Sequence, residues 1–223
     1  MRKVLITGTS SGIGKATARL FLKKGFFVFG LDIKPATIEN DNYAHCLCDV
    51  SKAKLLPDID GLEIIINNAG TIKEEDAIAT NLIGYINVGE KYGFQHSVKS
   101  VINVGSIAAR VGLDYPFYSA SQGGRISYTR NLAVRLGRFN KAKVNSISFG
   151  AVHSGLEPSL YENQAFMEQV ANESILKKWM TVEESAEWIY FVAVNNQSMT
   201  GQDILLDNGE EANCNFIDGG DAT

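Results

Sequence analysis

Residues 4–14 read Val-Leu-Ile-Thr-Gly-Thr-Ser-Ser-Gly-Ile-Gly, and this stretch decides the fold. Its three leading apolar residues predict a short buried strand, and the glycines that follow predict a tight turn. Between residues 14 and 24 the apolar and basic side chains take separate faces, which predicts an amphipathic helix closed by Gly25. Glycine permits positive φ and lets the backbone approach a diphosphate, and the free N–H groups of a helix start bind the anion. Strand, turn and helix together therefore predict a loop that binds a dinucleotide phosphate.

The second predicted strand ends in a carboxylate. Asp32 lies 18 residues after Gly14, where an acid can accept hydrogen bonds from both hydroxyls of an adenosine ribose. Because a carboxylate repels a 2′-phosphate, the sequence favours NAD over NADP, although Lys34 nearby keeps NADP open. The alternative is a glycine turn without a ligand, and the combination of loop, helix and distal acid argues against it.

Short apolar runs alternate with amphipathic stretches along the rest of the chain. This alternation predicts an α/β fold: a doubly wound (Rossmann) parallel sheet of about seven strands with helices on both faces. We expect residues 1–223 to form a single domain, with residues 151–180 as a lid over the substrate. The expected strands are residues 4–6, 26–31, 44–48, 62–66, 100–104, 143–147 and 204–206; the expected helices are residues 14–24, 74–95, 118–136 and 182–194, with one short crossover helix within 51–61.

The composition excludes several classes of function. Twenty-one Lys and Arg against 25 Asp and Glu give a net charge of −4, so nucleic acid is not an expected partner. No apolar run approaches the ~18 to 20 residues that span a bilayer, so no membrane partner is expected. Three cysteines, two of them next-but-one neighbours, indicate a reducing compartment, and without a signal-peptide pattern we expect a cytoplasmic protein. His45, Cys46, Cys48 and Asp49 alternate between the two faces of a strand, so no metal site is expected.

Seven motifs, in the right order, resemble those of the short-chain dehydrogenase/reductase family, over nearly the whole chain. They are residues 7–14, 49–50, 67–70, 81, 103–106, 118–121 and 200–209. The resemblance implies that the Tyr118 hydroxyl exchanges a proton with the substrate oxygen, that Ser106 holds this oxygen, and that Asn81 organises a water relay. With Gln122, these are the candidate catalytic residues. The candidate cofactor-binding residues are Gly8, Ser10, Ser11, Gly12, Ile13, Gly14, Asp32, Asp49, Val50, Asn68, Ala69, Gly70, Tyr118, Gln122, Gly150, Val152 and Ser154.

Three departures from the family pattern matter. The family motif is Tyr-x-x-x-Lys, and Gln122 stands where its lysine is expected, with no lysine between Lys99 and Lys141. The Pro-Gly pair expected after the sixth strand is Phe-Gly at residues 149–150, and Ser154 stands where threonine is common. The stretch between residues 70 and 81 is shorter than usual, which affects helix packing near the site and the expected dimer contact.

The absent lysine changes the expected chemistry. Free tyrosine titrates near 10, and an ammonium group ~5 Å from a phenolate favours ionisation by about 3 kcal/mol at an effective dielectric near 20. Gln122 supplies no charge but can hydrogen-bond a nicotinamide ribose. We therefore expect a slow enzyme that favours reduction, or one with an alkaline optimum for oxidation. Arg125 lies on the same helical face as Gln122; packing or a surface ion pair is its expected role, and supplying the missing charge is the alternative.

The resemblance implies an NAD(H)-dependent oxidoreductase that interconverts a ketone and a secondary alcohol. Two other functions stay open. One is a catalytically weakened dinucleotide-binding sensor or assembly protein, and the other is a lyase or isomerase that uses bound NAD without net redox. The expected partners are a small carbonyl or alcohol substrate and further copies of the chain, in a homodimer or homotetramer built from the long helices and the last strand.

Overall fold

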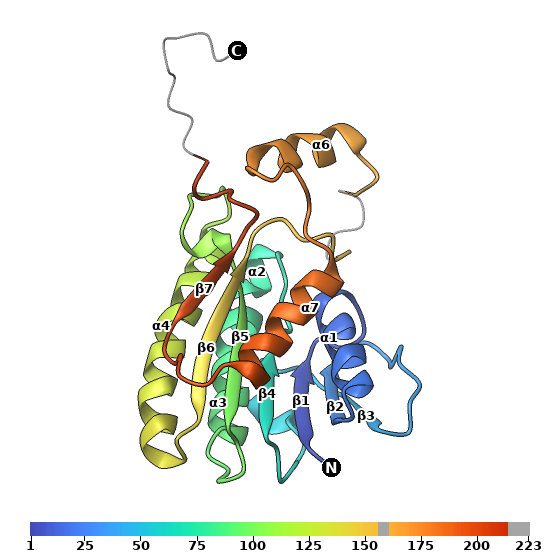
Figure 1. Cartoon of the computed structure of the whole chain (residues 1–223), viewed down its shortest axis with the longest axis vertical. Helices are drawn as coiled ribbons and strands as arrows, with labels where there is room; N and C mark the ends of the chain where they lie inside the picture. Colours follow the sequence, from blue (N-terminus) through green and yellow to red (C-terminus); the bar gives the residue numbers. More distant parts are fainter. Residues whose placement is uncertain (156–160, 214–223) are drawn as a thin grey trace.

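The computed structural model describes residues 1–155 and 161–213, which contain a seven-stranded sheet. Its strand order is β3-β2-β1-β4-β5-β6-β7, and every pairing is parallel (Figure 1). The strand order reverses between β1 and β4, as it does at the switch point of doubly wound folds. The predicted fold class is therefore confirmed. The strands are β1 (Lys3–Thr7), β2 (Phe27–Asp32), β3 (Tyr43–Leu47), β4 (Ile64–Asn67), β5 (Ser100–Ser106), β6 (Lys143–Phe149) and β7 (Asp203–Leu206).

Helices cover both faces of this sheet. α1 and α7 lie on the viewer's side in Figure 1, and α3 and α4 lie behind the sheet. Phe21 and Ile189 of the near helices belong to one apolar core, while Val88 and Leu132 of the far helices belong to the other. Because the sheet is buried on both faces, its central strands are continuous apolar runs. The α-helices are α1 (Gly12–Lys23), α2 (Glu74–Ala77), α3 (Gly84–Tyr92), α4 (Pro116–Phe139), α6 (Gln164–Glu173) and α7 (Val182–Tyr190). The 3₁₀ segments are η1 (Ala53–Leu55) and η3 (Ile107–Ala109), and the π-helical segments are η2 (Ile78–Ile83) and η4 (Phe191–Asn195).

The crossover between β3 and β4 differs from the prediction. Residues 51–61 contain the single 3₁₀ turn η1 and no α-helix. A helix of about ten residues would be only ~15 Å long, too short to return along the sheet and also turn at both ends. The segment instead runs back in an extended form and buries Leu56 and Ile59 in the core behind the sheet.

The predicted helix over residues 74–95 is interrupted. α2 continues directly into the π-helical segment η2, and α3 follows without a break. Asn81 lies within η2 and is completely buried. Because π-helical turns displace backbone carbonyls from the regular ladder and are frequent at functional sites, this irregularity marks the helix as part of the candidate site.

The predicted lid segment leaves the sheet after β6. Val152 forms an isolated parallel bridge with Met180, so the two ends of the segment lie together. Between them, α6 stands beyond the carboxyl edge of the sheet, at the top of Figure 1. Residues 156–160 of this segment lie outside the described residues. Its action as a lid stays a prediction.

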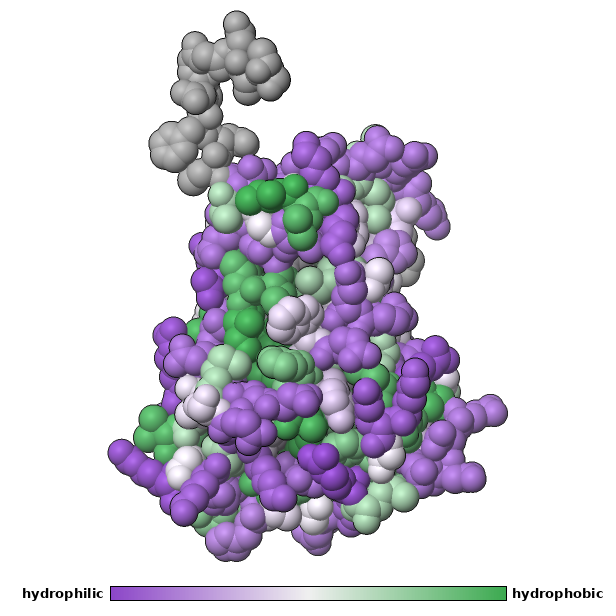
Figure 2. Space-filling model, viewed as in Figure 1, coloured by the Kyte–Doolittle hydropathy of each residue, from purple (hydrophilic) through white to green (hydrophobic). Residues whose placement is uncertain are grey.

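One edge of the sheet presents an apolar surface. β7 is the edge strand, and Figure 2 shows apolar residues in a band over it. On the helical run formed by α7 and η4, the rings of Trp188 and Phe191 meet edge to face while 43% and 51% exposed, respectively.

Residues 1–155 and 161–213 contain neither a candidate membrane-spanning helix nor a candidate metal site. Within these ranges no helix has the length and apolar character needed to cross a membrane. The same ranges hold no group of three or more His, Cys, Asp or Glu side chains arranged to bind a metal. Cys46 and Cys48 are free thiols, and Cys214 lies outside the described residues.

Candidate active site

The carboxyl ends of the parallel strands meet at the upper edge of the sheet in Figure 1. Ligands bind at this edge in doubly wound folds, because helix N-termini and loops converge there. The glycine loop follows β1 and residues 68–70 follow β4, whereas Asp32 ends β2 and Ser106 ends β5. Tyr118 lies in the first turn of α4. The sequence-predicted residues are therefore brought to one edge of the sheet.

The glycine loop is packed so closely that three of its positions leave no space for a side chain. Gly8 and Gly12 have φ angles of 77° and 55°. A Cβ on Gly14 would lie 2.0 Å from the Gly8 carbonyl oxygen, and a Cβ on Gly12 would lie 2.8 Å from that of Ser154. The first turn therefore requires glycine at these positions, and Ser154, at the start of the predicted lid, lies directly against it.

The loop is also joined to the end of β4. Thr7 Oγ1 accepts hydrogen bonds from the backbone N–H groups of Asn68 and Ala69, both at 2.9 Å, and Asn68 Nδ2 donates to the Thr7 carbonyl oxygen at 3.0 Å. At the other end of the loop, the side chain of Ser11, the N-cap residue of α1, makes no capping hydrogen bond among the described residues. The orphan N–H groups of that first turn are therefore available to an anion.

Asp32 is fastened to the glycine loop through its carboxylate. Oδ2 accepts the backbone N–H of Ser10 and Oδ1 accepts that of Lys34, each at 2.9 Å. Ser10 Oγ in turn lies within hydrogen-bonding distance of the carbonyl oxygens of Lys34 and Pro35. A carboxylate offers about four acceptor positions, so both oxygens keep capacity for a diol. Asp32 thus has a fixed orientation and free lone pairs.

A polar chain that the sequence did not indicate supports this corner. The Tyr43 hydroxyl lies 2.8 Å from Thr9 Oγ1 and 2.9 Å from His45 Nδ1. Burial raises the pKa of the Tyr43 hydroxyl above its usual value, and the hydrogen bond to Thr9 partly opposes this shift. The tyrosine is therefore a neutral structural group beneath the loop.

The other predicted cofactor residues on this side are in close contact with the helical run that contains Asn81. A Cβ on Gly84 would lie 2.7 Å from Val50 Cγ2, and a Cβ on Gly70 would lie 3.2 Å from Asn81 Oδ1. Asp49 Oδ1 accepts the N–H of Ser51 at 2.9 Å, which closes a turn after β3. These contacts leave no space for a larger residue at position 84 and little at position 70.

The residues after β6 meet an acid from the C-terminal turn. A Cβ on Gly150 would lie 2.8 Å from Glu210 Oε2, and Val152 is buried. Burial raises the pKa of Glu210 above its usual range, and the negative charges of Asp207 and Glu173 raise it further. A carboxyl group that the sequence did not indicate thus lies against the predicted cofactor segment.

Ser106 and Tyr118 present hydroxyl groups at the carboxyl edge. Ser106 is the N-cap of η3, and its Oγ accepts the N–H of Ala108 at 3.2 Å. Tyr118 is half-buried, and its hydroxyl has no hydrogen-bond partner among the described residues. A serine hydroxyl can donate while it accepts, so both groups can meet a substrate oxygen.

Asn81 uses its whole side chain for structural hydrogen bonds. Oδ1 accepts the N–H of Thr71 at 2.9 Å, and Nδ2 donates to the Thr71 carbonyl oxygen at 2.9 Å and to Ser121 Oγ at 3.2 Å. The side chain therefore ties the loop after β4 to α4. What Asn81 can still offer to the site is its backbone carbonyl, which the π-helical turn displaces.

Gln122 lies one turn after Tyr118 and is only 3% exposed. Its Oε1 is buried and has no hydrogen-bond partner among the described residues. An unpaired buried acceptor costs about 1–3 kcal/mol, so the site is incomplete without a donor. A hydroxyl of a bound ligand is a group that fits this position.

Arg125 does not form the surface ion pair that was one of its two expected roles. The residue is 3% exposed; its Nε donates to the Asn81 carbonyl oxygen at 3.2 Å, and its Nη1 donates to that of Val104. The guanidinium lies 4.0 Å from the centroid of the Tyr85 ring, and no described carboxylate is within ion-pair distance. Burial raises the pKa of Tyr85 to about 12, with the Arg125 charge opposing. The side chain points inward because its position faces η2 and β5.

Glu74 is a site residue that the sequence did not indicate. Its Oε2 accepts the N–H of Phe117 and its Oε1 accepts the N–H of Tyr118, both at 2.9 Å. Glu74 and Tyr118 are 44 residues apart in sequence, so no local sequence pattern predicts this contact.

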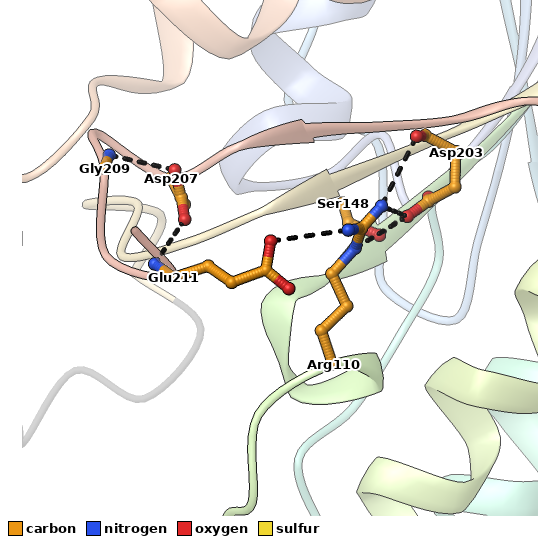
Figure 3. Close-up of polar contacts among 6 residues, drawn as sticks. All are labelled: Arg110, Ser148, Asp203, Asp207, Gly209 and Glu211. Carbon is orange, nitrogen blue, oxygen red and sulfur yellow. Dashed lines mark hydrogen bonds and ion pairs between the residues drawn. The ribbon is translucent and has the colours of Figure 1, made fainter. Parts of the chain in front are cut away.

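A second polar cluster joins the loop after β5 to the end of the sheet (Figure 3). Arg110 pairs with Asp203 on β7 at 2.8 Å and with Glu211 at 3.4 Å. Ser148 Oγ donates to Asp203 Oδ1 at 2.8 Å, and Asp207 accepts the N–H of Glu211 at 2.7 Å. The Asp203 side chain is 3% exposed, so this pair fixes the loop that follows Ser106.

Fold and site together define the class. A doubly wound sheet with a glycine loop, an acid at the end of the second strand, and a serine and a tyrosine at the same edge has the features of a dinucleotide-dependent oxidoreductase. Residues 8–211 match the family model described as "Enoyl-(Acyl carrier protein) reductase", and the chain belongs to the short-chain dehydrogenase/reductase family, whose members are NAD(P)-dependent oxidoreductases.

Similar proteins cover nearly the whole chain. The 3-oxoacyl-[acyl-carrier-protein] reductase FabG of Thermotoga maritima is 29% identical, over 92% of this chain and 96% of the relative. Among solved structures, 4-hydroxyisoleucine dehydrogenase complexed with NADH superposes with a TM-score of 0.84 at 23% identity, covering 95% of this chain and 99% of that one. ElxO with NADP bound reaches a TM-score of 0.82 at 22% identity over 95% and 99%. The structural likenesses support the fold alone.

Proposed function

We propose that the protein is an NAD(H)-dependent oxidoreductase that interconverts a ketone and a secondary alcohol. The observation that carries the proposal is the joint between Asp32 and the glycine loop, where the ribose-facing carboxylate accepts the Ser10 N–H beside an uncapped helix N-terminus. A diphosphate on that helix end would bring its ribose to Asp32.

The chain's own residues fit such a cofactor. In this proposal the glycine loop holds the diphosphate, Asp32 the adenosine ribose, and Asp49 with Val50 the adenine. The orphan Oε1 of Gln122 accepts a hydroxyl of the nicotinamide ribose; residues 68–70, Gly150, Val152 and Ser154 line the remaining path. When bound, the cofactor supplies or accepts the hydride.

The proton is handled by the hydroxyl pair. Tyr118 Oη donates a proton to the substrate oxygen during reduction and removes it during oxidation, and Ser106 Oγ holds the same oxygen. Asn81 contributes through its backbone carbonyl, which accepts Arg125 Nε and has a second lone pair for a water molecule of a proton relay.

We further propose that Gln122 occupies the position of the family's catalytic lysine. Reduction requires protonated tyrosine, which is the ordinary state at neutral pH, whereas oxidation requires tyrosinate, which is scarce below pH 10 without a nearby cation. The enzyme is therefore slow in oxidation and favours the carbonyl-to-alcohol direction near pH 7.

Replacing Gln122 with lysine should accelerate oxidation at pH 7 by about 10- to 100-fold and move its optimum toward neutrality. An ammonium ~5 Å from the phenolate favours ionisation by about 3 kcal/mol, or about two pKa units. The measurement is a pH–rate profile of alcohol oxidation. Gln122→Met, of similar length and without charge, is the control and should not accelerate the reaction. An unchanged rate and profile in Gln122→Lys would contradict this account.

The cofactor assignment is tested at Asp32. We expect the wild-type protein to bind NADH at least tenfold more tightly than NADPH, in titrations followed by nicotinamide fluorescence. Asp32→Ala should lose about 10- to 100-fold in NADH affinity, because hydrogen bonds to a charged group are worth about 1.5–3 kcal/mol. Asp41→Ala removes an exposed acid from the following loop and should change neither affinity. Equal affinity for the two cofactors would exclude the NAD preference.

Assays on the same purified protein distinguish two other functions from the proposed one. Gln122 favours a dinucleotide-binding sensor or assembly protein, and a carbonyl screen at pH 6 and pH 9.5 that finds binding without turnover would support it. The tyrosine beside a dinucleotide site also suits a lyase or isomerase, which would convert substrate without a net change in nicotinamide absorbance.

We propose that copies of the chain assemble into a homodimer or homotetramer. The edge strand β7 of the described sheet and the exposed Trp188–Phe191 pair support the proposal, since strand edges and exposed aromatic residues are both typical of contact surfaces. The other expected contact is made by the helical run around Asn81, from α2 through η2 to α3, and by α4, which carries Tyr118.

A further inference from the structure

We propose that Glu74 is a positioning residue that fixes Tyr118 at the start of α4. The proposal rests on the assigned role of Tyr118 and adds a residue that acts on it from another helix. It stands on the two 2.9 Å hydrogen bonds from the backbone of Phe117 and Tyr118 to the two oxygens of the Glu74 carboxylate.

The start of α4 lacks any cap of its own. Its first N–H groups have no intrahelical acceptor, Pro116 has no N–H, and the N-cap residue Tyr115 makes no side-chain capping bond. No acidic residue lies in the first turn of α4, although the helix dipole favours a negative charge there. Glu74 supplies both the missing acceptors and that charge.

The carbonyl oxygen of Tyr118 is also restrained, through Ser121, by the helical run that begins with Glu74. Ser121 Oγ donates to the Tyr118 carbonyl oxygen at 2.6 Å and accepts Asn81 Nδ2 at 3.2 Å. Glu74 begins α2, and Asn81 lies within η2, which continues it without a break. One rigid segment therefore restrains Tyr118 at its N–H and, through Ser121, at its carbonyl oxygen.

The short connection after β4 brings Glu74 to the start of α4. The path from Gly70 to Asn81 leaves room for a single turn before the π-helix, and that turn places Glu74 at α4. Since the Tyr118 hydroxyl has no partner among the described residues, its position depends on the backbone that carries it. A first turn that frays would move the hydroxyl away from the edge of the sheet.

The test compares Glu74→Ala and Glu74→Gln with Glu75→Ala in the full-length protein. Glu75 is the neighbouring acid on α2, is exposed, and makes no side-chain hydrogen bond within the described residues. A cap is worth about tenfold in the equilibrium between ordered and frayed turns. Because kcat follows the fraction of molecules with an ordered turn, this shift lowers kcat about twofold if the turn is ordered ten to one in the wild type, and about fivefold if it is ordered one to one. We therefore expect Glu74→Ala to lower kcat about two- to fivefold with KM for NADH unchanged, Glu74→Gln to lie between, and Glu75→Ala to match the wild type.

A second readout needs neither cofactor nor substrate. Amide hydrogen exchange, followed by NMR in the unliganded protein, reports the first turn through Ser119, whose N–H donates to the Tyr115 carbonyl oxygen at 2.9 Å. Its exchange should accelerate about tenfold in Glu74→Ala and stay unchanged in Glu75→Ala. Glu74→Gln keeps one acceptor and serves in both assays if the alanine variant does not fold.

The outcomes separate the two proposals. Unchanged Ser119 exchange in the Glu74 variants overturns the positioning role, and so does faster exchange with an unchanged kcat. A wild-type protein that turns over no carbonyl speaks against the proposed function, while the exchange measurement still decides whether Glu74 orders the turn that carries Tyr118.

Discussion

Tyr118→Phe should lower kcat by about 10³-fold, whereas the affinity for NADH should fall by no more than about tenfold, the worth of one neutral hydrogen bond. The substitution removes one hydroxyl, the group that exchanges the proton, and general acid–base catalysis contributes about 10²–10⁴. The phenyl ring keeps the half-buried packing, and the backbone contacts to Glu74 and Ser121 do not involve the hydroxyl. Steady-state reduction rates and calorimetric titration with NADH measure the two quantities.

Tyr115→Phe is the matched control for this prediction. Tyr115 lies three residues earlier, is 50% exposed, and loses the same hydroxyl. Its kcat should stay within about twofold of the wild type. If Tyr118→Phe keeps most of its turnover, Tyr118 is not the proton-transfer group and the reaction must be assigned to other residues.

Gly14→Ala should abolish dinucleotide binding, with an affinity loss of at least about 100-fold. Its new Cβ would lie 2.0 Å from the Gly8 carbonyl oxygen and 2.5 Å from Asn68 Nδ2. The first of these is backbone, so the loop itself must open, and the N–H groups at the start of α1 would no longer converge on a diphosphate. We also expect the free energy of unfolding to fall by about 1–3 kcal/mol from overpacking. Circular dichroism checks folding, and calorimetric titration measures binding.

Gly137→Ala provides the opposite control. Gly137 lies in the exposed last turns of α4, and a Cβ there meets nothing within 4 Å. The same substitution should stabilise the protein by up to about 1 kcal/mol, because glycine disfavours the helix relative to alanine, and should leave NADH binding unchanged. Tight NADH binding by Gly14→Ala would refute the assignment of this loop to the diphosphate.

Some features of the molecule could be predicted because neighbouring residues determine them. The alternation of apolar runs predicts β1 to β7, since strands buried on both faces require continuous apolar residues. Gly25 predicts the end of α1 and has the positive φ of 80° that a C′ position requires. The crossover helix within residues 51–61 was wrong, because connection length and the position of the next strand, rather than local propensity, decide what such a segment can form.

Other features depend on contacts across the fold. The sequence places Arg125 on the helical face of Gln122, yet only the packing of η2 and β5 around α4 shows that its guanidinium is buried against backbone carbonyls. The same is true of Asp203, whose partner Arg110 comes from a loop 93 residues earlier.

The sequence alone thus determined the parallel sheet, the glycine turn and the acid at position 32, because each depends on residues that are adjacent or one strand apart in the chain. Tertiary structure decided what surrounds Tyr118: Glu74 accepts its N–H, Ser121 donates to its carbonyl oxygen and itself accepts Asn81 Nδ2, and the unpaired amide oxygen of Gln122 lies one turn further on. The contacts of Glu74 and Asn81 join elements about 40 residues apart in sequence, and their geometry exists only once helices are packed on the sheet.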